Sequence, residues 1–190
     1  VYKRQADRIN IPFTVGGGIS TVDDAARLLD AGADKITVNS AAVARPELIS
    51  EIASRYGSQF VVAAIDAKLT DDGIWHVTTH GGSRFSDREL FSWAAEVQER
   101  GAGEIMFTSM NHDGTRSGYP CDVFARLADG LSIPVIASGG AGSVDDIADV
   151  LDQGKANAAL AASIFHYGEI SIGELKRRLA EKGIAVRLPG

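Results

Sequence analysis

The strongest constraint on the fold of this chain is an internal repeat, in which residues 11–32 return as residues 133–154. The two segments are identical at 11 of their 22 positions, which include an Ile-Pro start, a Gly-Gly pair and a Val-Asp-Asp run. Self-similarity at a fixed spacing indicates that one structural unit occurs twice. The fold must therefore hold two copies of that unit, 122 residues apart.

Short apolar runs alternate with amphipathic helical patterns along the chain. The runs are too short for helices and are nearly continuous, as in strands buried on both faces of a parallel sheet. The expected strands are Pro12–Val15, Lys35–Val38, Phe60–Ile65, Glu104–Thr108, Pro134–Ala137 and Asn157–Ala161. The expected helices are Thr21–Ala31, Pro46–Tyr56, Asp87–Arg100, Asp122–Asp129, Val144–Gln153 and Ile172–Glu181. Residues 67–84 hold an Asp-Asp-Gly turn and an alternating run, which predict a β-hairpin.

Six β-then-α units in succession predict an α/β fold with a parallel sheet. A doubly wound sheet also satisfies this alternation, but it does not predict a repeat spaced by four units. That spacing is typical of a (β/α)8 TIM barrel built from two half-barrels. We therefore expect residues 1–190 to form one partial TIM-barrel domain, units 3 to 8, with two β/α units preceding residue 1. The start without methionine, inside the helical pattern of residues 1–10, favours the same interpretation.

Composition excludes several classes of protein. The net charge of −6 argues against nucleic acid or an anionic membrane as the main partner. No apolar run approaches the roughly 20 residues of a membrane span. The single cysteine, Cys121, permits no internal disulfide and no cysteine metal cluster, so we expect the reducing cytoplasm, no metal and no cofactor.

Two glycine-rich turns predict two phosphate sites. Residues 16–18 and 139–140 each follow an expected strand and precede an expected helix, and glycine lets backbone N–H groups approach an anion closely. In each repeat the next strand ends in a small polar pair, Asn39-Ser40 or Ala162-Ser163. A single Gly-Gly turn is usually only a tight connection, but two matched copies predict a substrate with a phosphate at each end. Residues 113–118 lie beside the second copy and are expected to close over its phosphate.

Asp66 directly follows the expected strand Phe60–Ile65. A carboxylate at the carboxyl end of a barrel strand faces the active site and suits general acid or base catalysis. In isolation, an aspartate that caps a loop is the better interpretation. The repeat, however, places a counterpart of Asp66 upstream of residue 1, so two carboxylates would face one another across the barrel mouth.

Several motifs in this order resemble the cyclase subunit of imidazole glycerol phosphate synthase, an enzyme family of histidine biosynthesis. The resemblance covers the chain from about residue 9 to residue 190. The motifs are Phe13–Ile19, Val62–Lys68, Asp113–Tyr119, Ala137–Gly142, Ala161–His166 and the Val186–Leu188 ending. The sister phosphoribosyl-formimino isomerase shares the half-barrel repeat and both glycine turns. It is less similar at residues 64–68, 138–142 and 165–166.

The resemblance implies a lyase that uses ammonia to convert a ribulosyl-formimino aminoimidazole carboxamide nucleotide with two phosphates. The products are imidazole glycerol phosphate and an aminoimidazole carboxamide ribotide. Ammonia comes from a glutaminase subunit, the partner in a heterodimer, and travels through the barrel. A non-catalytic fragment that binds phosphates or this partner is the alternative of another class. The chain alone is expected to be inactive and to self-associate through its open strand edges.

Motif matching also assigns residues to roles. Asp66 corresponds to one of the family's two catalytic aspartates. Lys35 and Glu104 correspond to two members of the charged ring at the entrance of the ammonia tunnel. The residues that match the two phosphate sites are Gly18, Asn39 and Ser40 for one, and Asp113, Gly114, Gly140, Ala162 and Ser163 for the other.

Overall fold

A computed structural model describes residues 2–188. Its helices are α1 (Tyr2–Ala6), α2 (Val22–Asp30), α3 (Ser40–Ala44), α4 (Glu47–Tyr56), α5 (Leu90–Glu99), α6 (Cys121–Gly130), α7 (Val144–Asp152), α8 (Ser163–His166) and α9 (Ile172–Glu181). Its strands are β1 (Thr14–Gly16), β2 (Lys35–Val38), β3 (Val61–Leu69), β4 (Trp75–Thr79), β5 (Arg84–Glu89), β6 (Glu104–Ser109), β7 (Val135–Ser138) and β8 (Ala158–Ala159). A short 3-10 turn, Ser58–Phe60, precedes β3.

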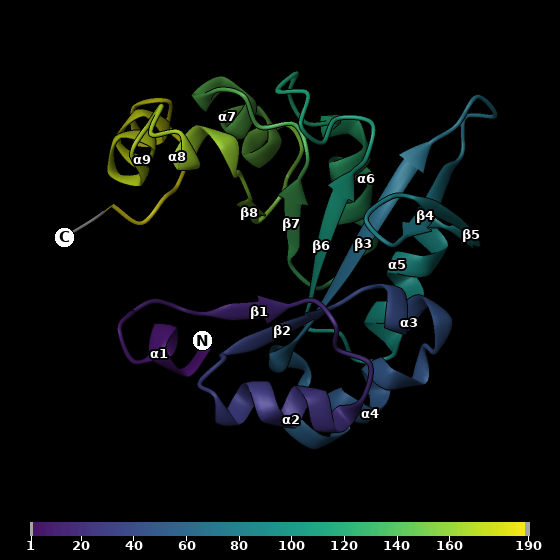
Figure 1. Ribbon diagram of the computed structural model, residues 1–190. Coiled ribbons are helices and arrows are strands. Elements are labelled where there is room, and N and C mark those ends of the chain that lie inside the picture. Colours follow the sequence, from purple (N-terminus) through teal and green to yellow (C-terminus); the bar gives the residue numbers. More distant parts are fainter. Residues whose placement is uncertain (1, 189–190) are drawn as a thin grey trace.

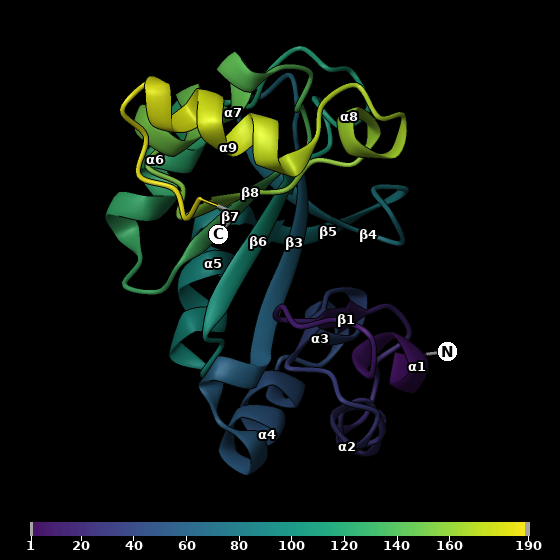
Figure 2. The ribbon, with the colours of Figure 1, turned by 90° about the vertical axis from the view of Figure 1, so that its left-hand side faces the viewer.

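Six of the strands form one parallel sheet in the order β1-β2-β3-β6-β7-β8 (Figure 1). The expected α/β class and parallel pairing are confirmed, and the sheet is curled as in a TIM-barrel protein. Strands β3 and β6 lie side by side at its centre, and β1 and β8 are its two ends (Figure 2). The structure describes residues 2–188, so it does not test the expectation of two β/α units before residue 1.

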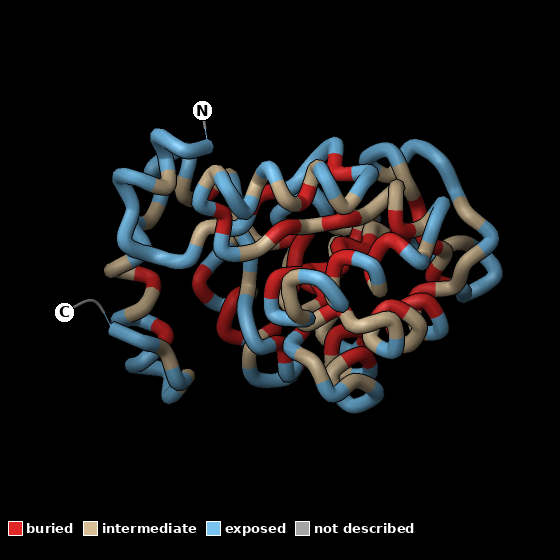
Figure 3. The backbone as a smooth tube through the Cα atoms, turned by 90° about the horizontal axis from the view of Figure 1, so that it is seen from below, coloured by how far each residue is buried: buried red, intermediate tan, exposed pale blue. Residues whose placement is uncertain are grey.

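Alternation along the strands separates the two faces of the sheet. On β2, β3 and β6 the residues that face the helices are almost fully buried, as Ile36, Ile65 and Phe107 illustrate. The intervening residues of β2 and β6, such as Thr37 and Thr108, are only half-buried and face the concave side, whereas Val62 and Ala64 of β3 are buried as well. Figure 3 shows the buried segments concentrated in the middle of the molecule. The core therefore lies between the sheet and its helices.

The sequence repeat is also a repeat of hydrogen bonds. Thr21 and Ser143, 122 residues apart, each accept a bond from the backbone N–H three residues later and so cap α2 and α7. Asp34 Oδ2 accepts from the N–H of Phe13 at 2.7 Å, and Asn157 Oδ1 accepts from that of Val135 at 2.9 Å. Phe13 and Val135 are 122 residues apart, but Asp34 and Asn157 are 123 residues apart. From Asp34 onward the two copies therefore match at an offset of 123.

The hairpin after β3 is present as expected. Strand β3 runs on to Leu69 because its last residues pair antiparallel with β4, which pairs in turn with β5. Strand β5 reaches Glu89, whose side chain accepts from the N–H of Ser92. Helix α5 therefore begins at Leu90, and the expected start of this helix at Asp87 is wrong.

Two other sets of expected boundaries need correction. The last strand is Ala158–Ala159, shorter than the expected Asn157–Ala161, because it pairs with β7 on only one side within the described residues. The first strand begins at Thr14, since the N–H of Phe13 is bonded to the Asp34 side chain. Helices α3 and α8, which begin shortly after β2 and β8, were not expected from the sequence. They are too short to show a helical period.

Candidate active site

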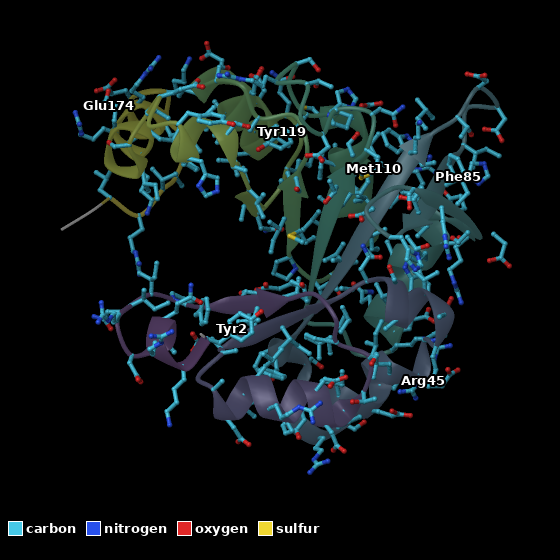
Figure 4. The ribbon with its side chains drawn as sticks, in the orientation of Figure 1. Tyr2, Arg45, Phe85, Met110, Tyr119 and Glu174 are labelled. Atoms are coloured by element: carbon cyan, nitrogen blue, oxygen red, sulfur yellow. The ribbon has the colours of Figure 1, made fainter. Side chains whose placement is uncertain are left out.

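The carboxyl ends of the parallel strands gather the expected site residues at one edge of the sheet. Asp66 lies on the concave face of β3, opposite Thr108 of β6 in the strand register. Asn39 directly follows β2, and its Nδ2 donates to Asp66 Oδ2 at 3.0 Å. The loop after β6 begins at Met110, and Figure 4 labels this residue beside the end of that strand. This edge is where catalytic groups lie in barrel enzymes.

A first pocket, of about 290 Å³, lies where β1 and β2 end. Its lining includes Gly17 and Gly18 from the turn after β1, and Asn39 and Ser40 after β2. Both glycines have positive φ angles, 96° and 72°, which non-glycine residues rarely adopt. The structure thus brings together all three residues that the sequence matched to the first phosphate site: Gly18, Asn39 and Ser40.

A second pocket, of about 90 Å³, lies where β6, β7 and β8 end. Its lining includes all five residues matched to the second phosphate site, namely Asp113, Gly114, Gly140, Ala162 and Ser163. A Cβ on Gly140, whose φ is 127°, would lie 2.1 Å from the carbonyl oxygen of Gly118. Only glycine allows the turn to pack against the loop after β6.

The two pockets are related by the sequence repeat. Gly18 of the first pocket corresponds to Gly140 of the second at the offset of 122, and Ser40 corresponds to Ser163 at the offset of 123. The two serines begin the short helices α3 and α8. Because both copies form a pocket from the same parts, a shared binding chemistry explains them better than two unrelated tight turns.

Sequence reasoning assigned no role to two other residues of these pockets, Thr37 in the first and Ser138 in the second. Arg116 also lines the second pocket, and it belongs to the segment 113–118 that was expected to close over the phosphate there. Thr37 and Ser138 lie within strands, where only the three-dimensional register shows that they reach the edge.

The environment of Asp66 suits a proton-transfer group. Partial burial raises the pKa of its carboxyl above the ordinary value, and hydrogen bonds from Asn39 and Thr108 oppose that shift. The charge of Asp113, which lines the second pocket, raises the pKa further. Asp66 therefore touches a residue of the first pocket and interacts electrostatically with one of the second.

Asn39 holds one further polar atom beside Asp66. Its Oδ1 is buried and has no partner within the described residues. A buried acceptor without a donor is unfavourable, so this atom is available to accept a hydrogen bond from a bound molecule.

Lys35 and Glu104 lie at the opposite edge of the sheet. They are the first residues of β2 and β6, the two neighbours of β3, and their side chains form an ion pair. The pair spans β3 at the amino ends of the strands, far from the edge that holds Asp66. The two side chains remain 28% and 20% exposed, so the pair stays accessible to a small polar molecule.

Residues 2–188 contain no group of three or more His, Cys, Asp or Glu side chains placed to hold a metal ion. None of their helices has the length and apolar character needed to cross a membrane.

Comparison with known proteins agrees with this geometry. Residues 1–171 match the family model described as histidine biosynthesis protein. The imidazole glycerol phosphate synthase subunit HisF of Phocaeicola vulgatus is 58% identical over 98% of this chain and 74% of that relative. The chain belongs to the HisF family. The HisF proteins of Bacteroides thetaiotaomicron and Natranaerobius thermophilus are 58% and 53% identical over 97% and 99% of the chain, and 73% and 74% of their own lengths.

Membership of the HisF family decides between the cyclase subunit and the sister isomerase, which the sequence motifs alone left as an alternative. The family is the cyclase subunit of a lyase in histidine biosynthesis, so the expected fold class, enzyme class and pathway are confirmed. The word subunit in the HisF name refers to an assembly of those relatives. The expectation of two missing N-terminal units is not borne out by these comparisons.

Proposed function

We propose that this HisF family member closes the imidazole ring of a bis-phosphorylated ribulosyl-formimino aminoimidazole carboxamide nucleotide with ammonia. The reaction releases imidazole glycerol phosphate and an aminoimidazole carboxamide ribotide. The observation that carries the proposal is the placement of Asp66 between two repeat-related pockets. It hydrogen-bonds to Asn39 of one and interacts with the charge of Asp113 of the other.

The two pockets bind the two phosphates of the substrate. Gly18, Asn39 and Ser40 hold one phosphate, and the second pocket, with Gly140 and Ser163, holds the other. Glycine turns expose backbone N–H groups, and serine hydroxyls add donors, so both pockets suit phosphate oxygens. Asp113, Gly114 and Ala162 complete the wall of the second pocket. Binding both ends fixes the reacting middle of the substrate across the mouth of the barrel.

Asp66 transfers protons at that middle. A carboxyl whose pKa lies above its ordinary value is a better general base, and near neutral pH a better acid, than an unperturbed aspartate. Asn39 positions the carboxylate through its Nδ2 donor, and its free Oδ1 accepts from an N–H or O–H group of the substrate.

The ammonia comes from a glutaminase subunit that forms a heterodimer with this chain. Its docking place is the amino-terminal edge of the sheet, where Lys35 and Glu104 pair. These two side chains gate the entry of ammonia, because an ion pair that spans β3 excludes bulk water yet opens by a side-chain rotation. We expect the two subunits to work in the cytoplasm, where glutamine is available and the thiol of Cys121 stays reduced.

The test is product formation by the protein expressed from its complete gene. Purified protein is incubated with the bis-phosphorylated nucleotide and an ammonium salt, and imidazole glycerol phosphate is measured by mass spectrometry. Asp66→Asn is the inactive control, and Arg177→Gln on the exposed face of α9 is the surface control. Product without added ammonia, or equal rates for wild type and Asp66→Asn, contradicts the proposal.

A further inference from the structure

The two pockets differ in charge, although the repeat relates their glycine turns and serines. Among the described residues, those that line the first pocket include no charged side chain. The second pocket has two, Asp113 and Arg116, both from the loop after β6. Asp113 repels a phosphate, since both are anions. A phosphate in the second pocket therefore requires a compensating cation.

The backbone of Arg116 is constrained, and its side chain forms an ion pair. Its φ angle is 61°, in the left-handed region, and an added Cβ on Gly142 would lie 2.4 Å from its carbonyl oxygen. Its guanidinium forms an ion pair with Glu169, and Nη2 lies 3.5 Å from the carbonyl oxygen of Gly142. Glu169 lies just beyond α8, so the ion pair joins the loop after β6 to the segment that follows α8.

The rest of the loop is also tied to the pocket. The N–H of Gly118 donates to the carbonyl oxygen of Gly140 at 2.9 Å. The hydroxyl of Tyr119, labelled in Figure 4, donates to the carbonyl oxygen of Leu160 at 2.8 Å. Because the backbone is held at both points, a response to a ligand is left to the Arg116 side chain.

We propose that Arg116 is the phosphate-binding cation of the second pocket and that Glu169 holds its guanidinium when no phosphate is bound. This inference rests on the proposed function, since it assigns the cation of one proposed phosphate site. On binding, the guanidinium leaves Glu169 and donates to the phosphate oxygens, which offsets the charge of Asp113. The first pocket has no counterpart and binds its phosphate through backbone and neutral donors.

The exchange of partners is favourable on general grounds. The side chains of Arg116 and Glu169 are 43% and 38% exposed, and an ion pair this accessible contributes little net stability. A guanidinium bound to phosphate makes two parallel charge-assisted hydrogen bonds to a group of higher charge than one carboxylate. Glu169 thus keeps the side chain near the pocket without competing strongly for it.

The experiment is a titration of the protein with inorganic phosphate, followed by nuclear magnetic resonance of the backbone amides. Signals of Gly140 and Ser163 report the second pocket, and those of Gly18 and Ser40 report the first. Arg116→Gln removes the charge, Arg116→Lys retains it, and Glu169→Gln frees Arg116. Arg177→Gln and Glu174→Gln, a surface ion pair on α9, are the matched controls.

We expect Arg116→Gln to weaken phosphate binding at the second pocket about tenfold to hundredfold, because a hydrogen bond to a charged group is lost. Arg116→Lys restores most of that affinity. Glu169→Gln strengthens binding about two- to fivefold, which is the range for removal of an exposed competing pair. The controls change neither pocket, and unchanged binding at the first pocket shows that the variants are folded. The affinity of the second pocket, but not of the first, falls steeply with added salt.

Two negative results are distinguishable. If phosphate binds at both pockets of the wild type and Arg116→Gln leaves the second unchanged, the role of Arg116 is refuted while the proposed function stands. If phosphate binds at neither pocket of the wild type, the two phosphate sites of the proposed function fail, and this inference fails with them.

Discussion

Gly140→Ala is the substitution for which the structure gives the clearest expectation. The added methyl group would lie 2.1 Å from the carbonyl oxygen of Gly118, and φ at residue 140 is 127°, a region that alanine avoids. Overpacking costs about 1–3 kcal/mol, and the backbone strain adds about 1–3 kcal/mol. We therefore expect the free energy of unfolding to fall by about 2–6 kcal/mol. The strain is local, so the loop after β6 moves away and the second pocket loses its phosphate.

Gly18→Ala is the matched control, because residue 18 is the counterpart of Gly140 in the first repeat. Its φ is 72°, and an added Cβ meets no atom of the described residues within 4 Å. Only the left-handed backbone is unfavourable, at about 1–2 kcal/mol. Urea unfolding curves and the Michaelis constant for the bis-phosphorylated substrate are measured for both variants. Equal losses of stability, or a smaller effect at residue 140, would refute the assignment of a steric role to Gly140.

Three further predictions concern the edges of the sheet. Asp66→Asn is expected to lower kcat about 10²- to 10⁴-fold with substrate affinity within about tenfold of wild type, and a kcat within threefold would exclude proton transfer by this residue. The same variant is expected to be more stable than wild type at pH 7, because burial raises the pKa of Asp66 and so disfavours its ionised form in the folded state. That advantage disappears as the pH falls through the raised pKa, where the wild-type carboxyl is protonated, and pH-dependent urea melts check it. Lys35→Met leaves Glu104 without its partner, and we expect glutamine-dependent turnover with the glutaminase subunit to fall about tenfold while turnover with free ammonia changes less. Equal losses with both nitrogen sources count against a gate.

The sequence determined the class of fold and the position of the site edge. Apolar runs of four to six residues alternate with helical patterns, and this periodicity depends on local burial, which a sequence records directly. The repeat of residues 11–32 as 133–154 then located both glycine turns and the serines paired with them. Asp66 was found because it follows an expected strand, and strand ends of a parallel sheet meet at one edge. Asp113 was assigned by the resemblance to the cyclase family.

Some features escaped sequence reasoning because they depend on contacts between distant residues. The shortness of β8 follows from its position at the end of the sheet, and the start of α5 follows from the extension of β5 to Glu89. Within the described residues β8 pairs with β7 alone, and β5 is extended to Glu89 by its pairing with β4, so the bounds of both strands depend on partners distant in the sequence.

Tertiary structure alone decided how the site residues act on one another. The bond from Asn39 to Asp66 joins residues 27 positions apart, and the ion pair between Arg116 and Glu169 joins residues 53 apart. A sequence lists these donors and acceptors but does not pair them, because hydrogen bonds and ion pairs form only within a few ångströms. The raised pKa of Asp66 also depends on tertiary structure, since only folding buries this carboxyl and brings the charge of Asp113 close to it. The sequence thus named the chemical groups of the site, and folding set their distances and so their chemistry.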